Sequence, residues 1–376
     1  MDVLIVGAGV GGLALARGLV ADGHRVRVLE RAPSLRAGGA AVTLASNGTA
    51  ALAGLGVALD GTGTPLDRLD FGDHTGRPTS AVDLRVPRER TGFGFVSVSR
   101  QELVARIAEG LPEGTVRFGR RVEDVRVRGG RAVVEADGAC LDADVVVGAD
   151  GQGSAVRRAV LGGPPARDAG WATWQGLSPV LPELAGGHRG RCLVGPAGFV
   201  GLLPAGSGRL QWWFDVRRGA ADPLPGSPVA MLRERFAGYA EPVGRLLAAV
   251  TDADVALYPH VLHRVPDAWG AGPTTLLGDA AHAFPPSQAQ GANQALEDAW
   301  LLRRALRGGA VVPALRDYER RRARRVRRVS RLAASQVTNR PPARVVAALY
   351  RRVPPATAGR LYGLVIGSWS HVLRAA

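Results

Sequence analysis

The stretch GDAAHAFPPSQAQGAN, residues 278–293, decides the fold assignment of this chain. It follows a short apolar run at residues 275–277, carries a glycine and an aspartate at its turn, and contains two prolines before the second glycine. By itself it predicts a tight turn followed by the start of a helix. Two upstream segments give it meaning: GAGVGG at residues 7–12 and GADG at residues 148–151.

The segment at residues 7–12 has the form of a dinucleotide-binding loop. Residues 2–6 are almost continuously apolar, as in a buried parallel strand, and apolar residues with helical spacing follow the loop. Gly7 allows a tight turn, Gly9 lets the backbone approach a diphosphate, and Gly12 lets the helix pack closely against the strand.

The next predicted strand, residues 25–29, supports this interpretation. It ends at Glu30, where an acidic side chain accepts hydrogen bonds from adenosine ribose hydroxyls. The helix start at Val10 and Gly11 offers unpaired N–H groups to phosphate oxygens. A strand–helix turn without a ligand would explain the glycines but not the acid. This unit alone does not distinguish FAD from NAD.

Together and in this order, the three segments resemble the flavoprotein aromatic hydroxylases, the single-component FAD monooxygenases related to para-hydroxybenzoate hydroxylase. The resemblance runs from Asp2 to about Val329. It implies an α/β fold with a Rossmann-like FAD-binding domain and an inserted antiparallel β-sheet substrate domain. The expected ranges are 1–72, 98–165 and 263–335 for the first, 73–97 and 166–262 for the second, and 336–376 for a C-terminal helical segment.

The resemblance also assigns roles to individual residues. Asp279 is expected to bond the ribityl chain of FAD, Arg100 its diphosphate or ribose, and the backbone of Pro286 to lie beside the ring. Small residues at 38–43 are expected to pass the isoalloxazine ring. The further candidate cofactor contacts are Arg31, Val42, Thr43, Val122, Gln290, Gly291, Ala292 and Asn293. The last four would begin a helix whose positive dipole end stabilises anionic reduced flavin.

Some of these residues also have a structural interpretation. Asp150 either orders the nucleotide-binding region or caps the following helix. An ordinary surface arginine in the first turn of the helix is the alternative for Arg100, and a plain turn explains Asn47 equally well. His282 is expected to hold its turn rather than to act as a base. Ala289 stands where many members of the family have glycine, which bears on the mobility of the flavin.

The chain between about residues 166 and 261 predicts the strands of the substrate sheet. Trp174, Trp212 and Trp213 are candidate pocket residues, with ordinary sheet packing as the alternative. Neighbouring residues on a strand face opposite ways, so only one of Trp212 and Trp213 can face the pocket. A largely apolar pocket favours a planar aromatic molecule, such as a polycyclic or indolic natural-product intermediate.

Composition narrows the function classes. The chain has 376 residues, enough for two packed domains, and a formal charge of +15. All 48 basic residues are arginine. The densest run, residues 320–331, is expected to be a solvated helix face rather than a nucleic-acid site. With only two cysteines, the chain is not expected to form a disulfide framework, which fits the reducing cytoplasm. No apolar run is long enough for a membrane span, so no membrane partner is expected. The protein is expected to be a monomer or a homodimer. No metal site is expected.

The resemblance implies a reaction as well. NADH or NADPH reduces non-covalently bound FAD, O2 adds to it, and the resulting C4a-hydroperoxide hydroxylates or epoxidises an electron-rich aromatic molecule. The cofactor carries this chemistry, so we name no catalytic side chain. Flavin-dependent halogenases share the fold but need an active-site lysine, which this chain lacks. An FAD-dependent reductase or oxidase that does not oxygenate its substrate is the alternative.

Overall fold

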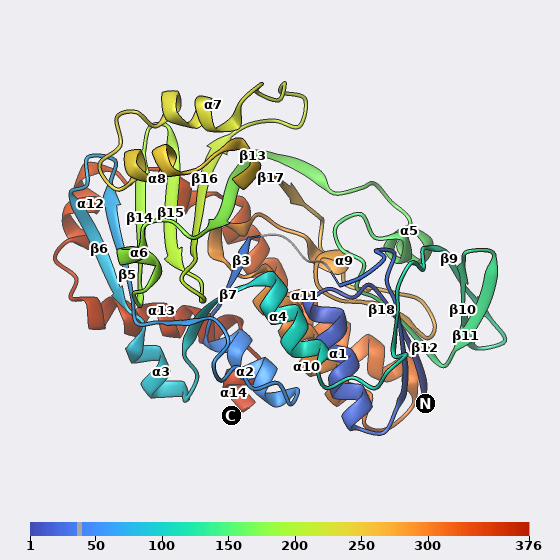
Figure 1. Ribbon diagram of the computed structural model, residues 1–376. Helices are drawn as coiled ribbons and strands as arrows, with labels where there is room; N and C mark the ends of the chain where they lie inside the picture. The colour runs from blue at the N-terminus through green and yellow to red at the C-terminus, as the bar shows by residue number, and fades with distance from the viewer. Residues whose placement is uncertain (36–39, 376) are drawn as a thin grey trace.

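A five-stranded parallel sheet forms the right-hand part of the molecule in Figure 1. The strands are, in order across the sheet, β18 (Thr274–Leu276), β12 (Val145–Gly148), β1 (Asp2–Val6), β2 (Arg25–Leu29) and β8 (Val116–Arg117). This computed structural model describes residues 1–35 and 40–375. The central strands are apolar and buried, as expected for a parallel sheet that is covered on both faces.

Helices cover one face of this sheet and a small antiparallel sheet covers the other. Helix α1 (Val10–Ala21) follows β1 and packs against α10 (Gly291–Ala305) and α4 (Arg100–Ala108). The small sheet consists of β9 (Val122–Arg128), β10 (Arg131–Ala136) and β11 (Ala139–Ala143). Helix α5 (Ala155–Leu161) packs beside it. The predicted Rossmann-like fold is confirmed.

A second small sheet connects the two halves of the molecule. Its strands are β3 (Ala41–Leu44), β7 (Phe95–Ser99) and β4 (Thr64–Leu66), all antiparallel. Helix α2 (Ser46–Gly54) follows β3 and packs against α10. Gly38 and Gly39, the first part of the segment predicted to pass the flavin ring, lie outside the described residues.

A seven-stranded sheet forms the left-hand part (Figure 1). Its strands are, in order, β17 (Ala256–Leu262), β13 (Arg167–Ser178), β16 (Leu210–Arg217), β15 (Gly198–Pro204), β14 (Arg189–Gly195), β5 (Arg68–Asp73) and β6 (Pro78–Asp83). The predicted antiparallel arrangement is confirmed except for β14 and β5, which are parallel. The expected boundary at residue 72 is wrong, because β5 begins at Arg68 and already pairs within this sheet.

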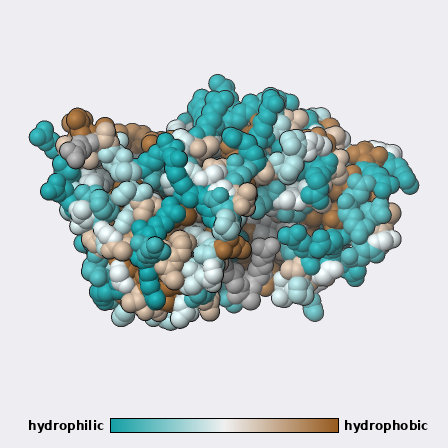
Figure 2. Space-filling model, turned by 90° about the horizontal axis from the view of Figure 1, so that it is seen from above, coloured by the Kyte–Doolittle hydropathy of each residue, from teal (hydrophilic) through white to brown (hydrophobic). Residues whose placement is uncertain are grey.

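The outer face of the large sheet is packed by α7 (Pro228–Arg235) and α8 (Val243–Ala249). Their apolar residues meet Trp174, Trp212 and Phe214 in one buried cluster. Helix α7 lies at the top in Figure 1 and faces the viewer in Figure 2, where this surface is largely hydrophilic. The opposite face of the sheet is therefore the one available to the FAD-binding half.

The C-terminal segment at residues 336–376 is helical where the structure describes it, as expected. Helix α11 (Val311–Ala334) is followed by η3 (Val337–Asn339), α12 (Arg344–Tyr350), α13 (Pro355–Trp369) and α14 (Val372–Ala375). Helix α13 packs against β6 and α3 (Arg85–Thr91), and α14 packs against α2. The segment thereby ties both halves together. Within the described residues, no helix is long and apolar enough to cross a membrane.

Candidate cofactor and substrate site

The glycine loop after β1 leaves one side open. Gly7 has φ +106°, and a Cβ there would lie 2.5 Å from the Ala149 oxygen, so only glycine fits. A Cβ on Gly12 would lie 2.1 Å from the Gly7 oxygen. Gly9 differs, because it is exposed and a Cβ there would meet nothing within 4 Å. The loop therefore turns its backbone at Gly9 and the start of α1 toward free space, as a diphosphate site requires.

Glu30 ends β2 beside this loop. Its Oε2 accepts a hydrogen bond from the Ala8 N–H at 2.8 Å, and its Oε1 accepts one from the Ala32 N–H at 2.9 Å. Each carboxylate oxygen keeps capacity for a further donor. Glu30 thus holds the glycine loop and remains able to accept from ribose hydroxyls. Arg31 is exposed, and Val122 is buried at the start of β9.

Asp279 follows β18 and Gly278, whose φ of +58° forms the turn. Its carboxylate is half-buried and receives no hydrogen bond from any described residue. Asp298 stabilises the turn around Asp279: its Oδ2 accepts from the Gly278 N–H at 2.8 Å and lies 2.6 Å from His282 Nε2. His282 is completely buried, so its expected structural role is confirmed. Asp279 presents a free acceptor from a rigid turn.

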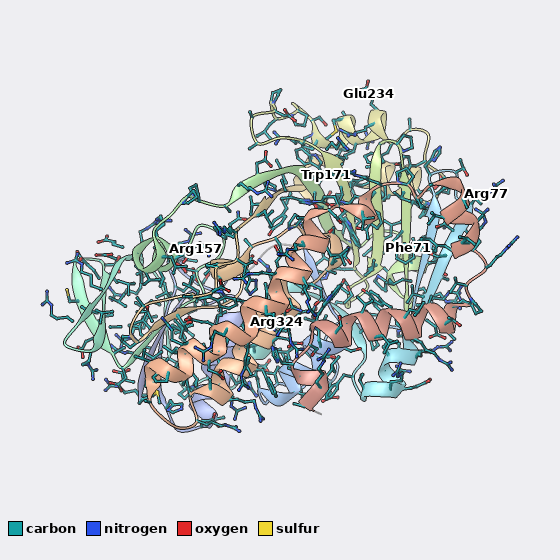
Figure 3. The ribbon with its side chains drawn as sticks, turned by 180° about the vertical axis from the view of Figure 1, so that it is seen from behind. Phe71, Arg77, Arg157, Trp171, Glu234 and Arg324 are labelled. Carbon is teal, nitrogen blue, oxygen red and sulfur yellow. The ribbon has the colours of Figure 1, made fainter. Side chains whose placement is uncertain are left out.

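Arg157 was not anticipated as a support for this turn. Its guanidinium donates to the Ala280 and Ala281 oxygens at 3.1 and 2.9 Å, and to the Arg264 oxygen at 3.1 Å. Burial lowers the pKa of this arginine. Figure 3 shows Arg157 at α5, on the FAD-binding half. The GADG segment is therefore joined to the Asp279 turn through the helix that follows it.

Asp150 caps that helix. Its Oδ1 accepts from Ser154 Oγ at 2.5 Å, and its Oδ2 accepts from the N–H groups of Ala155 and Val156 at 2.7 and 3.3 Å. Burial raises the pKa of Asp150, against these hydrogen bonds. The structure thus favours the capping interpretation over a direct cofactor contact.

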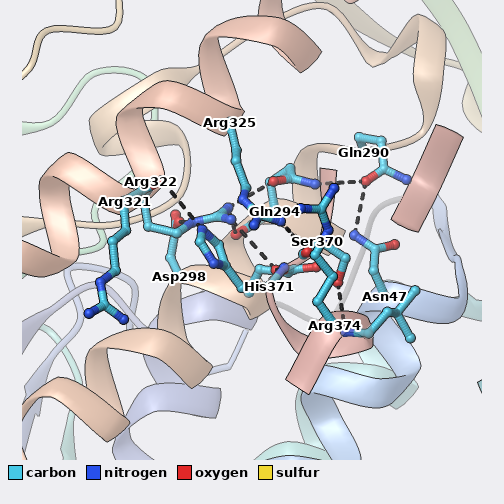
Figure 4. A network of polar contacts seen from close by, with 12 residues as sticks. Asn47, Gln290, Gln294, Asp298, Arg321, Arg322, Arg325, Ser370, His371 and Arg374 are labelled. Carbon is cyan, nitrogen blue, oxygen red and sulfur yellow. Dashed lines mark hydrogen bonds and ion pairs between the residues drawn. The ribbon is translucent and has the colours of Figure 1, made fainter. Parts of the chain in front are cut away.

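The start of α10 is anchored by a buried polar network, and Figure 4 shows the part of it that contains Asn47, Gln290 and Gln294. Asn293 accepts from the Ala45 N–H at 2.9 Å and donates to the oxygens of Thr43 and Ala289 at 3.0 and 2.7 Å. Gln290 Oε1 accepts from Asn47 at 3.1 Å and from Gln294 at 3.0 Å. The side chains of Asn293 and Gln290 therefore join α10 to β3 and α2. Because these two side chains are occupied, a contact of this segment with FAD would come from the backbone of Gly291 and Ala292, which are only half-buried.

Arg322 completes this network, and the expectation that residues 320–331 form only a solvated face is wrong for it. Arg322 is completely buried on α11. It bonds Asp298 Oδ1 at 2.5 Å and the Gln294 Oε1 at 2.8 Å. Burial alone would raise the pKa of Asp298, but the charges of Arg322 and His282 outweigh it, and the pKa lies below its usual value. No feature of the arginine-rich run distinguishes Arg322 except its position on the apolar side of the helix.

Arg100 and Asp279 of the FAD-binding half both act electrostatically on Tyr258 of the large sheet. Ser99 caps α4, accepting from the Glu102 N–H at 3.1 Å, and places Arg100 at the helix start. Arg100 is exposed, and its guanidinium makes no hydrogen bond with the described residues. Burial raises the pKa of Tyr258 on β17, Asp279 raises it further, and Arg100 lowers it, so both charged groups act on this tyrosine. Tyr258 was missed because a single tyrosine on a strand carries no motif.

Pro286 and Ala289 lie between the Asp279 turn and α10. Pro286 is exposed at the start of η2 (Pro286–Gln288). Ala289 ends this turn with φ +49° and ψ 29°, a left-handed conformation that favours glycine. The alanine noted in the sequence therefore occupies a strained backbone position.

Among the candidate pocket tryptophans, only Trp213 lies on the face toward the FAD-binding half. Gln211, two residues earlier on the same face, donates to the Ala41 oxygen of β3 at 3.0 Å. Trp174 and Trp212 lie in the core against α7 and α8, and Trp212 is completely buried. Their assignment to the pocket is wrong, because the alternation of β16 and its pairing with β13 turn both away.

The described residues fit an FAD molecule. The glycine loop, β3 and the Asp279 turn all adjoin the start of α10, because α1 and β3 pack against this helix and a Cβ on Gly278 would lie 3.1 Å from the Cβ of Ala295. Arg100 begins α4, which packs against α1. The potential metal ligands do not cluster: the described residues contain no group of three that could hold an ion.

Comparison with known proteins supports the same assignment. A family model described as an FAD binding domain matches residues 1–333. An FAD-dependent urate hydroxylase of Klebsiella pneumoniae subsp. pneumoniae is 34% identical over 350 residues, covering 87% of each chain. A 3-amino-4-hydroxybenzoate 2-monooxygenase of Streptomyces cremeus is 35% identical over 342 residues, covering 88% of this chain and 85% of that one.

The solved structures agree in fold. The crystal structure of Klebsiella pneumoniae HpxO with FAD and uric acid superposes with a TM-score of 0.89 at 31% identity, covering 98% of this chain and 96% of that one. A salicylate hydroxylase substrate complex has the same fold, with a TM-score of 0.78 at 22% identity over 99% of this chain and 98% of that one. The chain therefore belongs to the family of single-component FAD-dependent aromatic hydroxylases.

Proposed function

We propose that this protein is an FAD-dependent monooxygenase that uses NADH or NADPH and O2 to hydroxylate an electron-rich aromatic molecule. The observation that carries the proposal is that the glycine loop, β3 and the Asp279 turn, which are distant in the sequence, all pack around the start of α10. The open loop at Gly9, the unpaired Arg100 and the unpaired Asp279 come from distant parts of the chain. The relatives, which act on urate and on aminohydroxybenzoate, support an aromatic substrate.

Each candidate residue would bind a different part of the FAD molecule. The backbone at Gly9 and Val10 would bind the diphosphate, assisted by the positive end of α1. Glu30 would accept from the adenosine ribose, Arg100 would neutralise phosphate charge, and Asp279 would accept from the ribityl hydroxyls. When bound, the flavin supplies the electron transfer and oxygen activation.

The protein's own contribution is position and exclusion of water. The α10 start faces the expected place of the ring, where N–H groups of Gly291 and Ala292 stabilise negative charge. The face of the large sheet that carries Trp213 would cover the ring from the other side and orient the substrate. A non-covalent cofactor is expected, and we expect the protein to act in the cytoplasm as a monomer or homodimer.

The test is a measurement of product as well as of cofactor consumption. Purified protein should be yellow and should release FAD on acid precipitation. An aromatic substrate should stimulate NADH or NADPH consumption and acquire one oxygen atom from labelled O2. If consumption yields only hydrogen peroxide or water with every aromatic tested, the reductase or oxidase alternative is favoured. A colourless protein that cannot be reconstituted with FAD would refute the proposal altogether.

A further inference from the structure

The sheet face that carries Trp213 also carries a buried carboxylate. Asp215 lies two residues after Trp213 on β16 and is only 3% exposed. It is opposite Thr173 on β13 and Phe199 on β15, and Thr173 is in turn opposite Tyr258 on β17. Directly opposed residues in antiparallel strands share a face. Tyr258, Thr173, Asp215 and Phe199 therefore form one row across the sheet, on the side toward the FAD-binding half.

A directional chain of hydrogen bonds ends at Asp215. Asn339 Nδ2 donates to Gln336 Oε1 at 2.8 Å, which sets the orientation of the glutamine amide. Gln336 Nε2 then donates to His260 Nδ1 at 2.9 Å, which leaves His260 Nε2 to act as a donor on the other side of the ring. His260 Nε2 donates to Thr173 Oγ1 at 2.7 Å, and the Thr173 hydroxyl donates to Asp215 Oδ1. His260 is completely buried.

This chain accounts for only one oxygen of the carboxylate. Asp215 Oδ2 receives no hydrogen bond from any described residue. Among the described residues no arginine lies within 4 Å of the Asp215 carboxylate, and His260 Nε2 lies 3.7 Å from its Oδ1. Asp215 Oδ2 is not among the fully enclosed oxygens that lack a donor, so it keeps some accessible surface and can accept a hydrogen bond from a ligand.

The position is also appropriate for a substrate. Tyr258, at one end of the row, is within electrostatic reach of Asp279 and Arg100. At the other side, η3 is tied to η2, because Thr338 Oγ1 donates to the Ser287 oxygen at 3.1 Å. Asp215 is thus linked through Gln336 to the segment that begins at Pro286.

We propose that Asp215 anchors the substrate by accepting a hydrogen bond from an N–H or O–H group of a neutral aromatic ring, and that Thr173 and His260 are positioning residues for this carboxylate. This inference rests on the proposed function. It predicts a preference against aromatic carboxylates, because a second anion beside Asp215 would be repelled and no arginine of the described residues lies within 4 Å of Asp215 to offset the repulsion. The favoured class comprises neutral phenols and N–H heteroaromatics.

The test uses two probes that differ by one carboxylate, 2-hydroxypyridine and 6-hydroxynicotinate. Each is titrated into FAD-loaded protein, and the change in flavin absorbance gives a Kd. The wild type should bind 2-hydroxypyridine about 10-fold or more tightly than 6-hydroxynicotinate. Asp215→Asn should reduce this preference to less than about 3-fold with unchanged FAD content. Asp60→Asn, the same change at an exposed aspartate, should retain the preference.

Thr173 provides a second test if the Asp215 variant folds poorly. Thr173→Val removes the hydroxyl that holds Asp215 and should reduce the preference, while Thr173→Ser should restore it. Equal or tighter binding of 6-hydroxynicotinate by the wild type would overturn the inference, as would failure of 2-hydroxypyridine to perturb the flavin at millimolar concentration. An unchanged preference in Asp215→Asn would also overturn it. A protein that holds no FAD would instead refute the proposed function.

Discussion

Replacement of Arg322 by methionine should destabilise the protein and weaken FAD binding together. Methionine approximates the length and packing of the arginine stem but removes its charge and donors. The side chain is completely buried and bonds Asp298, the Gln294 oxygen and Gln294 Oε1 at 2.5, 3.1 and 2.8 Å. Its Nη1 also lies 3.6 Å from Glu297 Oε2. The substitution therefore leaves the buried carboxylates of Asp298 and Glu297 without their arginine partner.

The two carboxylates do not contribute equally to the cost. Burial raises the pKa of Glu297, so this group can take up a proton once Arg322 is gone. Asp298 keeps donors from Gly278 and His282, at 2.8 and 2.6 Å, but loses its nearest guanidinium. Breaking a buried pair by removing one partner costs about 3–5 kcal/mol. We therefore expect a loss of about 3 kcal/mol, at the lower end of this range.

Urea unfolding at neutral pH, with and without FAD, measures this loss. Arg324→Met is the matched control, because Arg324 lies two residues later on the exposed side of α11, as Figure 3 shows, and should change stability by less than about 0.5 kcal/mol. Arg322→Lys should fall between the two, since an ammonium cannot reproduce the planar fork. FAD affinity should fall in Arg322→Met because Asp298 holds the turn before Asp279. A loss below about 1 kcal/mol, or equal losses in both methionine variants, would refute this reasoning.

Asp279→Ala and Glu30→Ala should each weaken FAD binding by about 1.5–3 kcal/mol, or roughly 10- to 150-fold in Kd by flavin fluorescence titration; wild-type flavin retention after dialysis in both would contradict the site assignment. Ala289→Gly should stabilise the protein by about 0.5–1 kcal/mol in urea unfolding, because release of the left-handed strain exceeds the added freedom of the unfolded chain; a loss of stability would show that the conformation is not strained. His371 is held neutral by burial and by Arg322 and Arg325, which lower its pKa from 6.5 to about 4. The free energy of unfolding should therefore be unaffected by His371 above pH 6.5. As the pH falls from 6.5 toward 4, the unfolded state takes up the proton more readily, and the free energy of unfolding should fall by on the order of 1–2 kcal/mol after screening. His371→Gln should lack this part of the loss of stability in acid. Duplex DNA should not bind with sub-micromolar affinity at physiological salt, since steeply salt-dependent binding would require a true polyanion site.

The cofactor-binding half was largely predictable from the sequence because its constraints are local. The loop at residues 7–12 needs glycine where a Cβ would collide with backbone, and the strand before it must be apolar because it is buried on both faces. Glu30 and Asp279 end such strands, so their side chains necessarily reach the edge where ligands bind. A short motif therefore determines both the backbone path and the chemistry at its end.

The substrate half was predicted only as a set of strands. Periodicity identifies two faces of a strand but not which face meets the cofactor, and Trp174 and Trp212 were assigned to the wrong one. That choice depends on α7 and α8 packing against the outer face, which is a contact between distant segments. Tertiary structure alone also singled out Arg322 among many arginines, and brought Asp215, Thr173, His260 and Gln336 into one chain of hydrogen bonds. Isolated polar residues on separate strands carry no spacing signal, so their relation exists only once the chain has folded.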